Sequence, residues 1–236
     1  MIRSLDGAYN LTERANRYGS DKGTTTFGAH HYTPFYEMLL APRREGMSRM
    51  LEIGLLRGGP EVGIDKDRPT GELPSVRMWL DYFPNAMVHG FDISDFSFYR
   101  HERFTFHRGD SGNAADLEAI IANGEMFDFI IDDGSHASYH QQLAFAVLFR
   151  ALKPGGLYII EDLQWQSPAY EETLPATVLT RDLLLEFRRT GRFPELAAEE
   201  LKPIRRFARK ISEVLLVDQP FSEHTILKTA VIQKAY

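Results

Sequence analysis

Apolar residues from position 49 onward occur in short runs that alternate with amphipathic segments. The short runs are rich in β-branched and aromatic residues, which predicts strands, whereas apolar residues three or four positions apart predict helices. The expected strands cover 49–54, 87–93, 104–110, 127–132, 157–162, 211–217 and 224–233, and the expected helices cover 75–83, 115–124, 137–152 and 174–191. Strands that alternate with helices favour right-handed crossovers and a mostly parallel sheet.

The last two expected strands are separated only by the short segment 218–223. That connection is too short for a helical crossover, so we expect these two strands to be antiparallel. The pattern therefore predicts an α/β fold whose mostly parallel sheet carries an antiparallel hairpin at its edge. In such sheets ligands bind beyond the carboxyl ends of the strands, which is where candidate residues should gather.

Glycines and carboxylates follow the first three expected strands. Gly54 begins a glycine-rich turn after the first strand, Asp92 ends the second, and Asp110 closes the third. Glycine lets the backbone approach a ligand closely, and an acidic residue at this place can accept the hydroxyls of a ribose. Each feature alone is also consistent with a tight turn or a helix cap. Their succession favours a nucleoside-containing ligand, and the absence of G-x-G-x-x-G disfavours a dinucleotide dehydrogenase.

Four carboxylates follow the next two expected strands: Asp132, Asp133, Glu161 and Asp162. If those strands are neighbours they lie roughly 4.8 Å apart, so the carboxylates converge on one small volume. Their mutual repulsion would raise their pKa values, and a hard divalent cation with oxygen ligands would relieve it. Asp133, Glu161 and Asp162 could be ligands, whereas Asp132 continues the strand and could face a cofactor. The alternative is that these residues cap the following helices.

Four histidines remain to be interpreted. His136 follows the carboxylates, and beside a metal a neutral imidazole can accept a proton from a coordinated hydroxyl. His140 lies on the same helical face and could be a second ligand, although a histidine outside the metal shell is the commoner outcome. His30 and His31 fit either an ordinary loop or a segment close to the site. The basic stretch 202–210 is interpreted as a solvated helix face.

Composition narrows the class of protein. Of 236 residues, 43% are hydrophobic and 25% charged, which is ample for a folded core. The net charge of −6 argues against nucleic-acid and anionic-membrane partners. The absence of cysteine excludes disulfides, thiolate metal sites and a cysteine nucleophile. The N-terminal residues contain no apolar run typical of a secretory signal, so we expect a cytoplasmic protein.

Five stretches together resemble the metal-dependent sugar O-methyltransferases of natural-product tailoring, which include the mycinamicin and calicheamicin sugar methyltransferases. They are RYGSDKG…HHYTPFYE, LEIGLLRGG, SVRMWLDYFPNAMVHGFDIS, IIDDGSH and LKPGGLYIIEDLQ, and they lie between residues 17 and 165. The resemblance implies a Rossmann-like class I methyltransferase fold with a seven-stranded sheet. It also implies S-adenosylmethionine as cofactor and a divalent metal, usually Mg, that chelates two adjacent sugar hydroxyls.

The resemblance also assigns residues. The cofactor residues that it implies are Glu52 and Gly54 at the methionine end, Asp92 at the ribose, Asp110 and Ser111 near the adenine, and Asp132. The metal ligands that it implies are Asp133, Glu161 and Asp162, with His136 as the general base. Residues 1–48 would form a helical and loop segment that covers the site, and 49–236 the methyltransferase domain. Residues 60–74 depart from the family as a Gly/Pro/acid-rich insert, which we interpret as a lid or contact loop.

We therefore expect an O-methyltransferase that acts on a small-molecule glycoside, such as a deoxysugar on a natural product, and that forms a homo-oligomer. Two alternatives stay open. A methyltransferase or hydroxylase relative could use the same carboxylates on a catechol-like diol. A cofactor-binding module without catalysis is the other, although pure binding would not need His136 beside three metal ligands.

Overall fold

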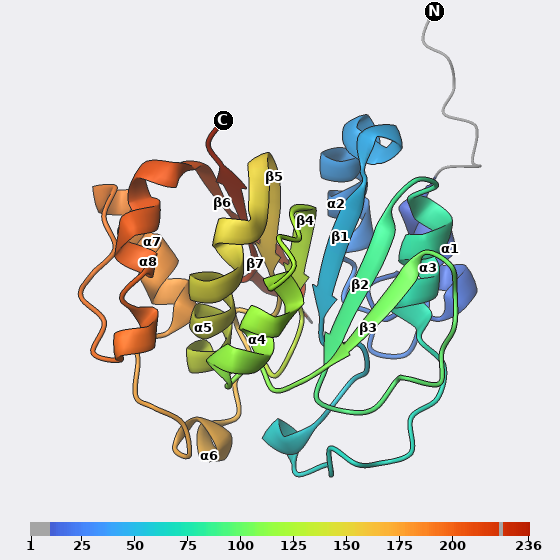
Figure 1. Ribbon diagram of the computed structural model, residues 1–236, viewed down its shortest axis with the longest axis horizontal. Coiled ribbons are helices and arrows are strands. Elements are labelled where there is room, and N and C mark those ends of the chain that lie inside the picture. Colours follow the sequence, from blue (N-terminus) through green and yellow to red (C-terminus); the bar gives the residue numbers. More distant parts are fainter. Residues whose placement is uncertain (1–9, 222–223) are drawn as a thin grey trace, which may run out of the picture.

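The computed structural model describes residues 10–221 and 224–236. Within them, seven strands form one sheet in the order β3-β2-β1-β4-β5-β7-β6 (Figure 1). The strands are β1 (Arg49–Ile53), β2 (Met87–Asp92), β3 (Phe104–Arg108), β4 (Phe127–Asp132), β5 (Leu152–Ile160), β6 (Ile211–Phe221) and β7 (His224–Lys234). Strands β1 to β5 pair in parallel, and β7 is antiparallel to both β5 and β6. The predicted parallel sheet with an antiparallel edge hairpin is confirmed.

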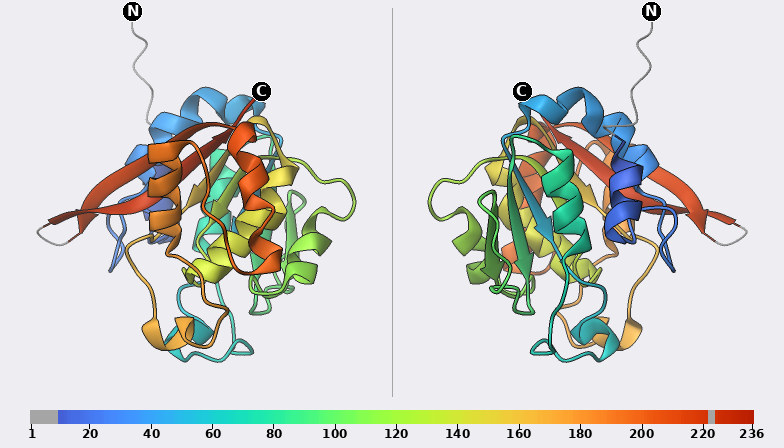
Figure 2. Two further views of the ribbon diagram at one scale, coloured as in Figure 1. Left: turned by 90° about the vertical axis from the view of Figure 1, so that its left-hand side faces the viewer. Right: turned by 90° about the vertical axis from the view of Figure 1, so that its right-hand side faces the viewer.

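Helices cover both faces of the sheet. One face carries α1 (Leu11–Tyr18), α2 (Thr33–Leu40) and α3 (Pro74–Tyr82), and the other carries α4 (Ala114–Ile121), α5 (Ser138–Leu148), α7 (Thr180–Thr190) and α8 (Ile204–Phe207) (Figures 1 and 2). Shorter pieces are α6 (Pro168–Glu171) and the 3₁₀ turns Ala41–Gly46, Pro60–Val62, Phe149–Ala151, Glu199–Leu201 and Ala208–Lys210. Among the described residues, no helix is long and apolar enough to cross a membrane.

Successive side chains of each strand point to opposite faces of the sheet, and two separate hydrophobic cores result. Ile130 faces the cluster under α4 and α5, whereas its neighbour Ile131 faces the cluster under α2 and α3. Every residue of α5 is buried, because this helix packs between the sheet and its neighbours α4 and α7. On the opposite face Trp79 of α3 stacks on Phe83 at 5.8 Å and meets Phe129 of β4 edge to face. These contacts fix the sheet between two rigid layers.

The N-terminal helices share the second core. Leu11, Ala15, Tyr36 and Leu40 are fully buried in the same cluster as Trp79. The segment that joins α1 to α2 is therefore held against the sheet at both of its ends.

Two expected boundaries are wrong. Strand β5 begins at Leu152, not at residue 157, because Leu152 pairs with Phe127 and a bulge follows before Leu157 pairs with Phe129. Gly155, with φ of 73°, allows this bulge, and a pattern of apolar residues does not reveal it. The expected helix 174–191 is helical only over α7, because the residues before it make hydrogen bonds to α5 instead: Gln142 Nε2 donates to the Val178 carbonyl, and the Thr177 hydroxyl donates to Oε1 of Gln142.

Candidate active site

The candidate site lies where the strand order reverses, between β1 and β4. The Asp133 N–H donates to the Ile53 carbonyl at 2.9 Å, so the chain after β4 runs close to the end of β1. Gly54 has φ of 82°, and a Cβ at this position would lie 2.0 Å from the Asp133 carbonyl oxygen. Only glycine fits there, and the glycine-rich turn consequently lies beside the carboxylates that follow β4.

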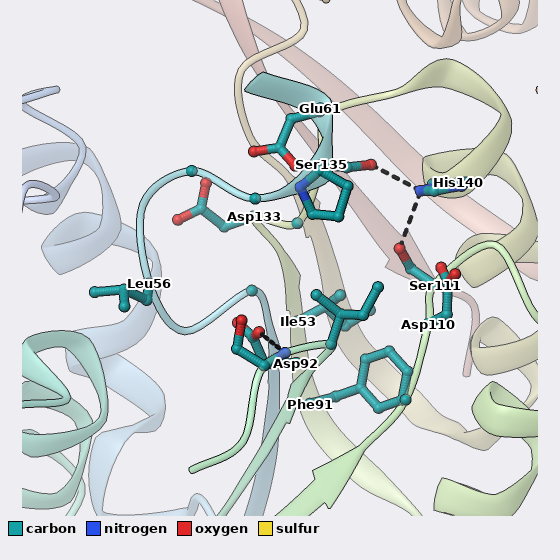
Figure 3. A pocket seen from close by; sticks show the side chains of 18 of the residues that line it. Ile53, Leu56, Glu61, Phe91, Asp92, Asp110, Ser111, Asp133, Ser135 and His140 are labelled. Atoms are coloured by element: carbon teal, nitrogen blue, oxygen red, sulfur yellow. Dashed lines mark hydrogen bonds between the residues drawn. The ribbon is translucent and has the colours of Figure 1, made fainter. Parts of the chain in front are cut away.

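A cleft opens at this edge and is shown in Figure 3. Its lining includes the predicted residues Gly54, Asp92, Asp110, Ser111 and Asp133, together with Pro60, Glu61, His140 and Tyr170. Pro60 and Glu61 belong to the insert, and the turn Pro60–Val62 contacts α6, which carries Tyr170. The insert therefore forms part of the cleft wall.

Asp92 fixes the turn that forms the floor of the cleft. Its Oδ2 accepts the Leu55 N–H and its Oδ1 accepts the Ser94 N–H, each at 2.7 Å. Burial raises the pKa of Asp92, and the two amide hydrogen bonds oppose that shift. Each carboxylate oxygen can accept more than one hydrogen bond, so Asp92 can hold this turn and still accept hydroxyls of a ligand.

His140 lies in the cleft and away from the acidic cluster. Its Nδ1 is 2.8 Å from the Ser135 hydroxyl and 3.2 Å from the Ser111 hydroxyl, as Figure 3 shows. The Asp110 carboxylate accepts the Gly112 N–H at 2.8 Å and so shapes the same loop. Burial lowers the pKa of His140, which favours the neutral ring. These contacts give His140 a part in positioning the wall of the cleft around Ser111.

Glu52 and Asp132 lie beneath the cleft and are not among the residues that line it. Glu52 is fully buried and accepts hydrogen bonds from the Ser75 hydroxyl at 2.8 Å and the Trp79 indole at 3.1 Å. Burial raises the pKa of Glu52 to about 7 and that of Asp132 to about 6. Oδ2 of Asp132 is buried without a hydrogen-bond partner in the described part of the chain.

Asp162 receives two of its side-chain partners, His30 and Tyr32, from the N-terminal segment. Its Oδ1 accepts the Tyr32 hydroxyl at 2.6 Å, and its Oδ2 lies 3.3 Å from Nδ1 of His30 and 3.8 Å from Nε2 of His136. Burial alone would raise the pKa of this carboxyl, but the hydrogen bond from His30 and the neighbouring imidazoles hold it well below its usual range. Asp162 is therefore ionised, although it is almost completely buried.

A buried lysine lies among the other carboxylates. The Lys22 ammonium donates to Oδ2 of Asp133 and, at 2.8 Å, to Oε2 of Glu161, and it lies 3.8 Å from Oε1 of Glu52. Oε1 of Glu161 accepts the Tyr36 hydroxyl at 2.6 Å. Burial, followed by repulsion from Asp133, raises the pKa of Glu161 well above its usual value despite Lys22. One ammonium is thus surrounded by more carboxylates than it can neutralise.

His136 is aimed at the same cluster by a strained backbone. Its φ of 59° lies in the left-handed region, which is uncommon outside glycine, and Asp162 and His31 are the other described non-glycine residues with positive φ. The Nε2 atom faces Asp162, whereas Nδ1 is buried without a hydrogen-bond partner in the described residues. The Trp165 ring lies edge to face with the imidazole, at 5.4 Å between centroids.

The residues present fit a hard divalent cation. Asp133, His136 and Asp162 each offer one donor atom, and these three atoms lie within 4.8 Å of one another. Glu161 is not one of these three residues, but the Lys22 ammonium links it to Asp133 by donating to both carboxylates. Carboxylate oxygens are the ligands that Mg²⁺ prefers, and the excess of buried acids over Lys22 supplies the charge.

Sequence reasoning missed Lys22, Tyr32 and Tyr36 as members of the site. The spacing of the two tyrosines was a usable signal, because residues four apart at a helix start share one face. Lys22 gave no such signal, since a single lysine in a polar loop is ordinarily solvated.

No family model matches the chain, but its sequence is similar to those of known sugar O-methyltransferases. It is 36% identical over 210 residues to an 8-demethyl-8-alpha-L-rhamnosyl tetracenomycin-C 2'-O-methyltransferase from Streptomyces olivaceus, covering 86% of this chain and 52% of that protein. It is 38% identical over 158 residues to a mycinamicin VI 2''-O-methyltransferase from Micromonospora griseorubida, covering 65% of this chain and 36% of that protein. The chain thus spans about half the length, or less, of these relatives.

Solved structures agree with the sequence relatives. The MycE methyltransferase of the mycinamycin biosynthetic pathway, in complex with Mg and SAH, superposes with a TM-score of 0.71 at 27% identity over 96% of this chain and 55% of its own. A complex of MycE with Mg, SAH and mycinamycin VI gives 0.69 at 28% identity, over 96% and 54%. The fold expected from the motifs is confirmed, and the chain is a homologue of the sugar O-methyltransferases of antibiotic biosynthesis.

Proposed function

We propose that this protein transfers a methyl group from S-adenosylmethionine to a hydroxyl of a sugar on a glycosylated natural product, with the help of a divalent cation. One observation carries the proposal: Asp133 both lines the cleft beside the glycine-rich turn and belongs to the acidic cluster that could hold a cation. A protein that only bound the cofactor would not need the acidic cluster beside the cleft. The activities of the homologues and the Mg and SAH bound by MycE support the same assignment.

The cleft is proposed to bind the cofactor. Asp92, at the end of β2, would accept the ribose hydroxyls, and Asp110 and Ser111, after β3, would lie near the adenine. Gly54 would let the methionine end approach the backbone. Glu52 and Asp132 would then act from beneath, by holding the turns that contact the ligand, as their buried contacts suggest.

Asp133, Glu161 and Asp162 are proposed to hold the cation, and Oε2 of Glu161 would exchange Lys22 for it. A cation bound there would lower the pKa of the acceptor hydroxyl and orient it. His136 would accept the hydroxyl proton at Nε2, the ring nitrogen that faces the cluster. The oxygen then attacks the sulfonium methyl, so that the O–C bond forms while the S–C bond breaks and its electron pair stays on sulfur.

The assembly of the protein is also part of the proposal. Residues 10–48 would cover the acidic cluster, as the contacts of Lys22, Tyr32 and Tyr36 suggest, and the insert 60–74 would act as a lid or contact loop. We propose a homo-oligomer, supported by the edge strand β6, where Leu215 is 41% exposed. The expected cytoplasmic location stays a prediction.

The test is incubation of the purified protein with methyl-labelled S-adenosylmethionine and a panel of glycosides and catechols. We expect label on one sugar hydroxyl, located by mass spectrometry and NMR. If the label appears on a catechol instead, the acceptor is a catechol-like diol and the proposed sugar acceptor is wrong. Tight binding of S-adenosylmethionine without transfer to any acceptor would favour the non-catalytic binding module.

A further inference from the structure

We infer that Trp165 is the platform on which the acceptor sugar lies, and that it favours deoxysugars over fully hydroxylated ones; this inference rests on the proposed function. Trp165 follows β5 in the turn that carries Glu161 and Asp162, and its backbone N–H donates to the Asp162 carbonyl at 3.0 Å. Its ring meets the imidazole of His136 at 5.4 Å and 88°. The indole is therefore built into the same turn as the proposed ligands and touches the proposed base.

Exposure distinguishes Trp165 from the other tryptophan. The side chain of Trp79 is fully buried, whereas 36% of Trp165 remains exposed. Single exposed apolar residues are common and need no explanation by themselves. The position of Trp165 is what matters, because its ring contacts the imidazole of His136 and its backbone contacts Asp162, and both of those side chains can bind hydroxyls.

A pyranose needs both kinds of contact. Its hydroxyls suit the acidic cluster and His136, but its C–H face requires an apolar surface, and binding sites usually combine aromatic walls with a few polar groups. An aromatic ring supplies that surface rigidly, with few rotatable bonds to order on binding. A sugar that lies against the indole would have its hydroxyl edge within reach of His136.

The loop holds the indole in place before any ligand binds. Gln164, on one side, donates from Nε2 to Oδ1 of Asp162 at 2.7 Å. Gln166, on the other side, donates from Nε2 to the hydroxyl of Ser138 at 2.6 Å, and Ser138 is buried at the start of α5. Because both neighbours are anchored, the tryptophan backbone is positioned and little ordering is left for binding.

The preference among sugars follows from the area that each sugar can bury. A methyl group in place of a hydroxymethyl group enlarges the apolar surface, and it leaves one fewer hydroxyl without a partner against the indole. Trp165 should therefore discriminate most strongly between sugars that differ only in this group.

Fluorescence tests the contact without any turnover. Since Trp79 is shielded, quenching by acrylamide reports on Trp165. With SAH and Mg present, methyl α-L-rhamnopyranoside should protect the emission from acrylamide in a saturable way, and methyl α-L-mannopyranoside, its 6-hydroxy counterpart, should do so only at roughly tenfold higher concentration. The Trp165→Phe variant should lose the signal. An absence of protection at saturating rhamnoside, or equal protection by both sugars, would overturn the inference.

Steady-state kinetics of Trp165 variants is the second test. Trp165→Ala should raise KM for the glycoside about tenfold, with kcat and cofactor affinity changing far less, and Trp165→Phe should recover most of the loss. The control is Phe98→Ala, another exposed aromatic residue, in the connection from β2 to β3. An unchanged KM in Trp165→Ala would refute the platform while leaving the proposed function intact. Failure of the unaltered protein to methylate any glycoside would instead reject the function, and the fluorescence result would still decide on the contact.

Discussion

Replacing Lys22 by Met should destabilise the protein in the absence of metal and strengthen its binding of Mg²⁺. Lys22 is 1% exposed, and its ammonium is the cation nearest to Asp133, Glu161 and Glu52 in the described residues. Methionine keeps most of the apolar length of the side chain, so the substitution removes charge and hydrogen bonds with little loss of packing.

The magnitude follows from the burial of the carboxylates. Breaking a buried ion pair on one side ordinarily costs about 3–5 kcal/mol. Here we expect the lower end, about 3 kcal/mol at pH 7, because the pKa of Glu52 is already raised to about 7 and burial and Asp133 raise that of Glu161. Both groups can take up a proton when the ammonium is lost, so the cost should shrink further as the pH falls.

Urea unfolding followed by circular dichroism measures this cost in chelator and in excess Mg²⁺. A ligand that binds only the folded state adds RT ln(1 + [L]/Kd), so a tenfold tighter site in Lys22→Met would appear as about 1.4 kcal/mol more stabilisation by Mg²⁺ than in the unaltered protein. Lys66→Met, at an exposed lysine of the insert, is the matched control. Equal stability of Lys22→Met and Lys66→Met in chelator, or an equal gain from Mg²⁺, would refute this account of the cluster.

Three further predictions concern the base, the cofactor and pH. His136→Ala should lower kcat by roughly 10²–10⁴-fold while calorimetry finds near-normal cofactor affinity, and near-normal turnover would move the base to His30. Asp92→Asn should weaken S-adenosylmethionine binding about tenfold or more by calorimetry, because one carboxylate oxygen becomes an amide donor facing the Leu55 or Ser94 N–H. Burial, aided by the charge of His107, lowers the pKa of His89 from 6.5 to about 4, so its contribution to stability is complete above pH 6.5 and is lost as the pH falls toward 4. Urea unfolding of His89→Leu should show a pH slope smaller by up to about 3 kcal/mol over that interval, and an unchanged slope would contradict the assignment.

The parts of the site that belong to strand ends were predictable from sequence. Asp133, Glu161 and Asp162 follow two apolar runs that predicted strands, and parallel neighbours bring their carboxyl ends to one edge. Adjacency was the one assumption, and the pairing of β4 with β5 confirms it. Asp92 at the end of β2 was found by the same reasoning.

The contacts of the N-terminal segment were not predictable in the same way. Lys22, Tyr32 and Tyr36 reach carboxylates more than a hundred residues away, and no local periodicity encodes such a pairing. Similarly, the inward turn of His136 depends on a left-handed backbone that only tertiary packing stabilises. Local sequence patterns predict the sheet and the edge where the site lies, whereas the partners of the buried charges depend on tertiary structure.

The most direct test of the central claim is metal dependence of methyl transfer. Protein stripped of metal would be incubated with labelled S-adenosylmethionine and the glycoside that serves as acceptor, first in chelator and then with excess Mg²⁺. The account predicts no labelled sugar in chelator and full recovery with Mg²⁺, because Asp133, Glu161 and Asp162 are proposed to hold the cation that orients the acceptor. Equal transfer in chelator would contradict it, and the acidic cluster would then have only a structural role.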